Sequence, residues 1–434
     1  MKKHTANYIK KTLLFTINSL LDYRDELIVS PNSSFTRTKK ISFEQTMLFP
    51  MVAGSDNTAT ELIDMFDEDK IPLPSAMIQR RNQIKPEAFK RMFLMFTQKI
   101  PISNTYEGYQ IVACDGTRIN LPYNPSDSYS HISCIKGRKG INQVHLNSLY
   151  DPLNDLFLDA DIQGIHDMNE NDAFISFLDK YTNESQKRIY IADRGYGSYN
   201  IFSHALHNQQ NFLIRVSRNF VEGMCTNDKF WLKEDSCDKE ITVTIGRRKT
   251  KELQKLNNYH CIPSCRRYDY LEAKSNQTET LSLRVLKFKI KENTYEYIVT
   301  NLSSEEFSLK NIKELYQLRW GEEVAFRHLK YAGNMVHIHS LKKEFLIQEI
   351  YAKLTMYNFS TWISSVAANA AKSKSGKYLY VLNHAQVQKI CARFIKNVIR
   401  NVIGLIFKYM VPVRPGRKFA RHLRRQSADT LTYR

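Results

Sequence analysis

Apolar residues recur at helical spacing through the first hundred residues of the chain. The segments TANYIKKTLLFTINSLLDY and NTATELIDMFDE return an apolar side chain to one face at intervals of about three to four residues. After two prolines, SAMIQRRNQIKPEAFKRMFLMF predicts a pair of short helices, and Pro86 suits the first turn of the second one. The basic residues of this pair are Arg80, Arg81, Lys85, Lys90 and Arg91. The pair is interpreted either as a helix-turn-helix-like contact to nucleic acid or as a solvated basic face.

The pattern changes at about residue 105, where short strand-like runs alternate with turns. YEGYQIVACDGTRINLP and NQVHLNSLYDPLNDLFLDADI predict strands, a helical stretch follows from Asn169 to Tyr181, and RIYIADRGYGSYNIF predicts another strand. This order of strands, helix and strand indicates an α/β sheet layer. From about 211 to 302 the pieces NFLIRVSRN, KEITVTIGRR, LSLRVLKFKI and YEYIVTNL follow one another with hardly any helical pattern, which predicts an all-β insertion.

Beyond Ser303 the chain returns to helical spacing, and it ends in the basic segment VRPGRKFARHLRRQ. The predicted regions are a helical N-terminal region (1–104), the first part of an α/β core (105–210), a β-strand insertion (211–302), the second part of the core (303–365) and a helical, basic C-terminal region (366–434). These boundaries depend on changes of pattern alone, because the sequence shows no internal repeat and no low-complexity linker.

The charge of the chain narrows the range of partners. Among 434 residues, 63 lysines and arginines stand against 44 aspartates and glutamates, a net charge of +19 that favours a polyanion such as nucleic acid. A membrane surface is the rival partner, but no run approaches the roughly 20 apolar residues of a spanning helix. The nearest run, from Phe394 to Val413, is interrupted by Lys396, Arg400 and Lys408 and predicts an amphipathic helix. We therefore expect no membrane association.

The first residues offer no secretory cleavage pattern, so we expect a cytoplasmic protein. Seven cysteines, an odd number in so long a chain, fit a reducing compartment better than a disulfide framework. Cys225, Cys237, Cys261 and Cys265 fall in one region with His260, but their spacing matches no familiar zinc pattern. Unliganded thiols are the preferred interpretation over a zinc site.

Two aspartates occupy the same local setting. Asp115 follows an apolar run in VACDGT, Asp193 follows another in IADRGY, and a glycine comes within two residues of each. A carboxylate at the carboxyl end of a buried strand, followed by a glycine that admits a ligand, is where α/β sheets place their chemistry. Each motif alone is equally well a turn, but two of them in the same setting favour a functional site.

A third carboxylate lies in NIKELYQLRWGEEVAFRHLKYAG, which lacks proline and predicts one long helix. Ser303 with Glu306, or Ser308 further on, offers the signal that starts this helix. At about 100° per residue, one narrow polar stripe of this helix carries Tyr316, Arg319, Glu323 and Lys330. Another face, which we expect to be buried, carries Leu315, Leu318, Ala325 and Leu329. The alternative is a solvated face with an Arg–Glu pair, but aromatic residues interleaved with basic ones favour stacking beside phosphate contacts.

The spacing Tyr316-x2-Arg319-x3-Glu323-x6-Lys330 resembles the Y-R-E-K signature of DDE transposases of bacterial insertion sequences of the IS-four type. VACDGT and IADRGY look like the first and second aspartate motifs of that family, so the resemblance covers residues 109–330. It implies an RNase H-like catalytic core interrupted by the β-strand insertion, with region 1–104 binding DNA. It also implies cut-and-paste transposition, in which a homodimer cleaves transposon ends and transfers the strands into target DNA.

The resemblance further implies that Asp115, Asp193 and Glu323 are catalytic and hold two Mg²⁺ ions, for which Mn²⁺ can substitute. Three carboxylates suit this task, because hard divalent ions take oxygen ligands and two ions stabilise both the attacking and the leaving oxygen of a phosphodiester. The partner is double-stranded DNA, as terminal inverted repeats and as target, in a nucleoid-associated bacterial protein. The residues implied in binding this DNA are Tyr316, Arg319, Trp320, Lys330, Arg215 and Arg194.

One departure from the family pattern precedes the third carboxylate, where an aliphatic residue is common and this chain has Glu322 after Gly321. Gly321 costs a helix interior about 1 kcal/mol, and Glu322 is a second candidate ligand. On an unbroken helix, Glu322 projects about 100° away from Glu323, towards the leucine face. Two other functions stay open, namely a catalytically inactive, transposase-derived DNA-binding protein and a structure-selective nuclease on the same core.

Overall fold

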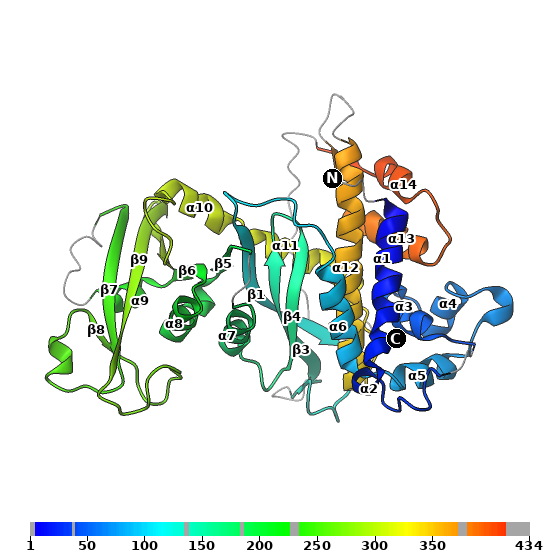
Figure 1. Ribbon diagram of the computed structural model, residues 1–434, viewed down its shortest axis with the longest axis horizontal. Coiled ribbons are helices and arrows are strands. Elements are labelled where there is room, and N and C mark those ends of the chain that lie inside the picture. The colour runs from blue at the N-terminus through cyan, green and yellow to red at the C-terminus, as the bar shows by residue number, and fades with distance from the viewer. Residues whose placement is uncertain are drawn as a thin grey trace.

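The computed structural model describes residues 5–36, 40–133, 139–182, 186–225, 234–371 and 380–413. One large mixed sheet runs through the molecule, and a layer of helices from both ends of the chain lies beside it (Figure 1). The strand order is β2-β3-β1-β5-β6-β10-β9-β7-β8, and β4 pairs with β3 outside this path. The chain is therefore an α/β protein, as the sequence predicts.

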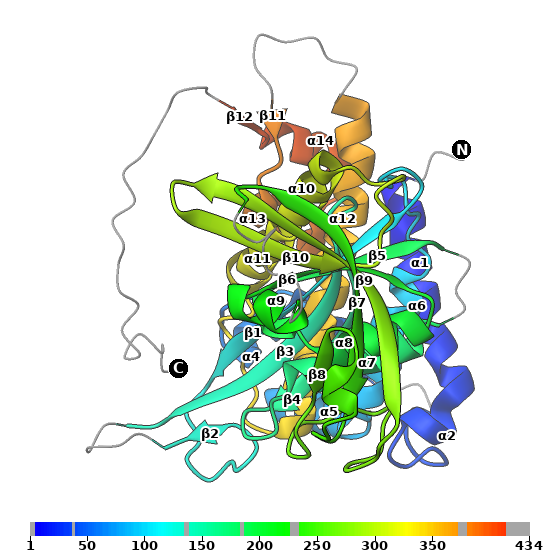
Figure 2. The same ribbon diagram turned by 90° about the vertical axis from the view of Figure 1, so that its left-hand side faces the viewer.

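The strands of this sheet form both antiparallel and parallel pairs. They are β1 (Gln110–Leu121), β2 (His131–Ile132), β3 (Ile141–Asp151), β4 (Leu156–Gly164), β5 (Arg188–Ala192), β6 (Asn211–Val216), β7 (Cys237–Gly246), β8 (Tyr259–Cys261), β9 (Thr278–Lys291) and β10 (Thr294–Thr300). β1 pairs antiparallel with β3 and parallel with β5, and β5 pairs parallel with β6. Figure 2 shows the β1–β3 pair reaching outwards to β2. A separate small pair joins β11 (Tyr380–Val381) and β12 (Val411–Pro412).

Fourteen α-helices lie in the part of the chain that the structure describes. They are α1 (Ala6–Ser19), α2 (Arg24–Leu27), α3 (Phe43–Val52), α4 (Thr58–Ile63), α5 (Pro74–Asn82), α6 (Pro86–Thr97), α7 (Glu170–Lys180), α8 (Tyr199–His207), α9 (Arg218–Met224), α10 (Leu309–Gln317), α11 (Trp320–Arg327), α12 (Lys343–Ala371), α13 (His384–Ile395) and α14 (Val402–Lys408). The predicted start of α6 at Pro86 is confirmed, and Asn169 caps α7 at the start of the predicted helical stretch.

The expected insertion is not separated from the core by any break in the sheet. β6 pairs with β5 and β10 pairs with β6, so both lie inside the main sheet. One hydrophobic cluster also joins Val112 and Phe174 to Val243 and Val285. By its pairing, β6 belongs to the first part of the core, and β7, β8 and β9 extend the sheet at one end (Figure 1). An apolar run does not reveal its partner, which is why the sequence placed β6 in the insertion.

The terminal regions form one helical layer together with the core. The helix α12 runs through the boundary expected at residue 365, and α1 and α6 pack along it (Figure 1). A single cluster joins Leu13 of α1 and Phe93 of α6 to Ile363 of α12 and Leu146 of β3. The helical layer and the sheet therefore share one hydrophobic core.

The two arginines of α5 do not form the basic surface that the sequence predicts, because both are buried. Arg80 donates to the carbonyl of Ile41, and Arg81 donates to the side chain of Gln348 and the carbonyl of Phe345. Only 7% of Arg80 and 6% of Arg81 is exposed. Both side chains satisfy buried acceptors, so neither is free to meet a phosphate.

The predicted amphipathic helix from Phe394 to Val413 is wrong, because the segment contains a break. α13 ends at Ile395, Asn397 adopts a φ of 63°, and Asn401 caps a new helix by accepting from the backbone of Gly404. Residues 414–434, with most of the predicted basic tail, lie outside the described residues. Across the described ranges, none of the helices combines the length and apolar character that crossing a membrane requires.

Candidate active site

The two predicted aspartates lie at adjacent positions on neighbouring strands. The parallel register of β1 and β5 pairs Cys114 with Ala192, and the next residues are Asp115 and Asp193. The expectation that Asp115 ends its strand is wrong, since β1 continues to Leu121 along β3. β5 ends at Ala192, so the edge of β1 that pairs with β5 up to Cys114 has no strand beside it from Asp115 onwards. The open edge gives both carboxylates room for a ligand.

Backbone groups hold each aspartate in place. Oδ1 of Asp115 accepts from the N–H of Gly116 at 2.8 Å, and Oδ1 of Asp193 accepts from the N–H of Gly195 at 2.7 Å. Burial raises the pKa of Asp115 to about 6; the charges of Asp193 and Glu323 add to this rise, while the Gly116 N–H and Arg319 oppose it. A carboxylate whose pKa is raised partly by neighbouring carboxylates marks a place where negative charge is concentrated.

The segment with the third carboxylate is not the single long helix that the sequence predicts. Ser308 and Asn311 form a capping box that starts α10, as expected for Ser308, but α10 ends at Gln317. A tight turn follows, in which the N–H of Arg319 donates to the carbonyl of Tyr316, three residues back. α11 then leads into a π-helical turn at His328–Ala332. The angles of an ideal helix therefore do not hold along the whole segment.

The polar stripe is consequently not free along its length. Tyr316 is buried in the hydrophobic cluster under α10, and Arg319 is 5% exposed. Lys330 is half-buried and donates from Nζ to Oγ1 of Thr117 at 2.6 Å, two residues beyond the first aspartate. Trp320 is 54% exposed, and the Arg319 guanidinium lies 4.6 Å from its ring.

The two adjacent glutamates differ in their surroundings. Glu322 is fully buried, as its position on the leucine side predicts, and accepts from Oγ of Ser148 at 2.7 Å. Burial raises the pKa of Glu322 well above its ordinary value. Glu323 is partly exposed and accepts from Nη2 of Arg319 at 2.8 Å, while Nη1 of Arg319 lies 3.8 Å from Asp115. The Arg319 guanidinium therefore stands between the first and third predicted carboxylates.

The remaining predicted DNA contacts lie near this centre. Arg194 is exposed in the short 3₁₀ turn Arg194–Tyr196 that follows Asp193. Arg215 on β6 lies 3.6 Å from Glu296 and close to Tyr316. The structure thus gathers Asp115, Asp193, Glu323, Arg319 and Lys330 at one sheet edge, with Trp320 and Arg194 exposed beside them and Arg215 one strand further away. The sequence missed Thr117 and Ser148, since neither residue type nor spacing marks them.

These residues fit a hard divalent metal ion in their chemistry. All three carboxylates offer oxygen ligands, and their mutual repulsion at Asp115 is what a bound cation relieves. Within the described ranges, no three His, Cys, Asp or Glu side chains are arranged around a common point as metal ligands, and this includes the cysteine region. At the carboxylates the reason is visible, because Arg319 supplies the opposing charge to two of them.

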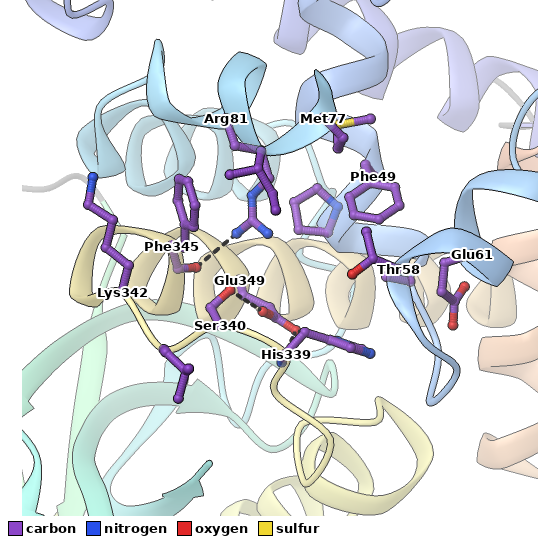
Figure 3. Close-up of a pocket in the computed structure, with 14 residues that line it drawn as sticks. Phe49, Thr58, Glu61, Met77, Arg81, His339, Ser340, Lys342, Phe345 and Glu349 are labelled. Carbon is purple, nitrogen blue, oxygen red and sulfur yellow. Dashed lines mark hydrogen bonds and ion pairs between the residues drawn. The ribbon is translucent and has the colours of Figure 1, made fainter. Parts of the chain in front are cut away.

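A cavity of about 260 Å³ lies elsewhere, between α3, α4, α5 and the start of α12. Figure 3 shows Arg81, His339 and Glu349 meeting on one side of it and Phe49 and Met77 on the other. None of the residues that line this cavity belongs to the predicted site. This cavity is therefore separate from the candidate active site at the sheet edge.

Comparison with known proteins places the whole region around this sheet edge within one family match. Residues 106–359 match the family described as "Transposase DDE domain". The transposase for insertion sequence element IS1151 of Clostridium perfringens is 23% identical over 81% of this chain and 80% of its own length. The putative transposase InsL for IS186A of Escherichia coli K12 and the transposase for IS421 of Escherichia coli are each 25% identical over 56% of this chain and 61% of their own length.

One solved structure with a similar arrangement is a piggyBac transposase synaptic complex with hairpin DNA. Its TM-score is 0.47 at 7% identity, covering 94% of this chain and 82% of that one. A similarity of this size is too weak to assign a fold or a function.

Proposed function

Because the chain belongs to the DDE transposases of bacterial insertion sequences, we propose that it cuts DNA at the ends of a mobile element and transfers the freed strands into target DNA. The observation that carries the proposal is the pair Asp115 and Asp193 at adjacent positions of parallel strands, with Glu323 joined to Asp115 through Arg319. The catalytic unit is an RNase H-like core extended by β7, β8 and β9.

Asp115, Asp193 and Glu323 hold two Mg²⁺ ions in this proposal, and Mn²⁺ can replace them. Bound there, the ions activate the attacking oxygen and stabilise the leaving oxygen of the phosphodiester. The backbone N–H groups of Gly116 and Gly195 orient the two aspartates. Ser148 fixes α11 against β3 through Glu322, which keeps Glu323 turned towards the sheet edge.

Double-stranded DNA lies across this edge in the proposed complex. Lys330 reaches phosphates near the cleaved end, Trp320 offers an exposed ring for stacking, and Arg194 and Arg215 add positive charge. Arg319 is buried between Asp115 and Glu323, so it contacts a phosphate only once bound metal ions have taken over these two carboxylates. Tyr316 supports Arg319 from the core. Region 1–104 contributes to recognition of the ends through residues other than the buried Arg80 and Arg81. Two copies assemble on the paired ends in the nucleoid.

The test uses linear DNA that carries both ends of the insertion sequence in which this reading frame lies. Wild-type protein should cleave the ends in Mg²⁺ and join them to a target plasmid. Asp115→Asn and Asp193→Asn should lose both steps and still bind the ends in a mobility-shift assay, since these changes remove metal ligands and no phosphate contacts.

The other possible results each contradict one part of the proposed function. Cleavage without joined products would show a nuclease, and binding without cleavage in any divalent metal would show a DNA-binding protein. Near wild-type cleavage by either aspartate variant would overturn the metal site. A complex with one protein copy on two paired ends would overturn the dimer.

A further inference from the structure

The glycines that follow the two aspartates both face one glutamate on another element. A Cβ atom placed on Gly116 would lie 2.8 Å from Oε1 of Glu170, and one placed on Gly195 would lie 3.9 Å from Oε2 of the same residue. Glu170 is the first residue of α7, which packs against β1 and against the turn after Asp193. The absence of side chains at both glycines therefore lets a fourth carboxylate approach the two aspartate motifs.

The position beside Gly195 is shared with the second aspartate. Oδ1 of Asp193 lies 3.1 Å from the same Cβ position that Oε2 of Glu170 approaches to 3.9 Å. Two carboxylates from different elements thus border one small space, which any side chain larger than glycine would fill. Two carboxylates that border one space offer oxygen ligands from two sides, which is an arrangement that suits a cation between or beside them.

A buried histidine orients Glu170. Nε2 of His145 lies 3.1 Å from Oε1 of Glu170, with the histidine 3% exposed and the glutamate 39% exposed. The His145 side chain lowers the pKa of Glu170, so the carboxylate stays charged. A buried ring this close to a carboxylate limits where the carboxylate can lie, as outer residues of metal sites do for the groups nearer to the ion.

An unpaired amide beside the same space points to a polar ligand. Asn147 lies directly opposite Gly116 in the β1–β3 register, so its side chain is on the face of the sheet where Glu170 and His145 meet. Asn147 is 1% exposed, and within the described ranges neither Nδ2 nor Oδ1 of its amide has a hydrogen-bond partner. Burying an unpaired amide destabilises the fold, and a small polar ligand that pairs with the amide would offset this.

We infer that Glu170, held by His145, is a further acidic residue of the metal site, which strengthens binding of a divalent cation beside Asp193. This inference rests on the proposed function, because it takes the site at Asp115 and Asp193 as the metal site. Glu170 acts as a positioning residue: it adds negative charge and a hydrogen-bond acceptor on the α7 side, opposite the face on which Glu323 lies.

The experiment measures Mn²⁺ binding to the full chain without DNA, by the paramagnetic resonance signal of the free ion. Glu170→Gln keeps the size of the side chain and removes its charge, and it should weaken Mn²⁺ binding by about tenfold or more. Asp172→Asn is the matched control, since Asp172 lies in the same helical turn but pairs with Arg267 on the surface. The control should stay within about twofold of wild type.

Asp193→Asn separates this inference from the proposed function. If Asp193→Asn weakens Mn²⁺ binding and Glu170→Gln behaves like Asp172→Asn, the role of Glu170 is wrong and the metal site stands. If Asp193→Asn leaves Mn²⁺ binding unchanged, the proposed metal site itself is wrong. Should Glu170→Gln unfold, Glu170→Ala replaces it: a loss of Mn²⁺ binding of about tenfold in the folded variant supports the role of Glu170, and binding within about twofold of wild type overturns it.

Discussion

Buried charged side chains gather in two regions of this molecule. The two regions differ in how fully opposite charges and hydrogen bonds compensate these side chains. Beside the cavity in the helical layer, Glu349 accepts from His339 and Ser340, and the buried Lys353 donates to the carbonyl of Ala53. Arg81 has its own acceptors in the same layer. At the sheet edge, by contrast, Asp115 and Glu323 share the buried cation Arg319, and the charge of Asp193 adds to the negative charge around Asp115.

The difference teaches which region is built for stability and which for a ligand. A buried charge that is paired with its partners is compatible with a stable fold. Removing one partner destabilises the fold, because the other charge then stays buried without a counter-charge. Like charges held together raise the energy of the folded protein until a ligand neutralises them, and such groups are typical of functional sites. The following predictions test this contrast, from the largest effect to the smallest.

Glu323→Gln should reduce metal-dependent cleavage by more than about a hundredfold, because a lost ligand costs more than the roughly 10–100-fold of a lost outer residue. Glu322→Gln should leave cleavage within a few-fold of wild type, since the uncharged Glu322 already serves as a buried hydrogen-bonding group to Ser148. Cleavage of transposon ends in Mg²⁺ and Mn²⁺ measures both. An inactive Glu322→Gln beside an active Glu323→Gln would reverse the assignment of the third carboxylate.

Glu349→Gln should lower the free energy of unfolding by about 3–5 kcal/mol, because it leaves His339, Arg81 and Lys353 without their buried counter-charge. Burial opposes the charge of Glu349, but the His339 hydrogen bond and the charge of Arg81 hold its pKa below 4.5. The loss should therefore be full at neutral pH and vanish as the pH falls below 4.5. Urea unfolding measures it, with the half-exposed Glu344→Gln as control; equal stabilities of the two variants at pH 7 would contradict the prediction.

Asp115→Asn should gain stability relative to wild type as the pH rises, in buffer without divalent metal. The folded pKa of Asp115 is raised from 3.8 to about 6, so the wild-type protein holds its full stability below 3.8 and loses part of it through pH 6. Asparagine does not titrate, and the relative gain at pH 7 should be on the order of 1–3 kcal/mol. Thermal or urea unfolding at pH 4 and pH 7 gives the difference. A variant less stable than wild type at pH 7 would show that the negative charge of Asp115 is already compensated in the folded protein, and would contradict the prediction.

Several features of this protein follow from residues close together in the sequence. Pro86 and Ser308 begin helices where the sequence predicts them, because a cap depends on neighbours within one turn. The matched settings of Asp115 and Asp193 were likewise visible, since an apolar run that ends in aspartate and glycine is a local signal. The sequence also predicted the alternation of strands and helices, because that depends on periodicity.

Only the tertiary structure decided which charges are buried and which face the sheet edge. Arg81 donates a hydrogen bond to Gln348, 267 residues away, and Glu322 accepts one from Ser148, 174 residues away. The residues next to Arg81 or Glu322 in the sequence therefore do not indicate these partners. The tight turn before α11 and the partnership of Glu170 with Gly116 also arise from packing. A helical angle can separate Glu322 from Glu323, but whether a side chain meets solvent or a strand depends on what the rest of the chain places beside it.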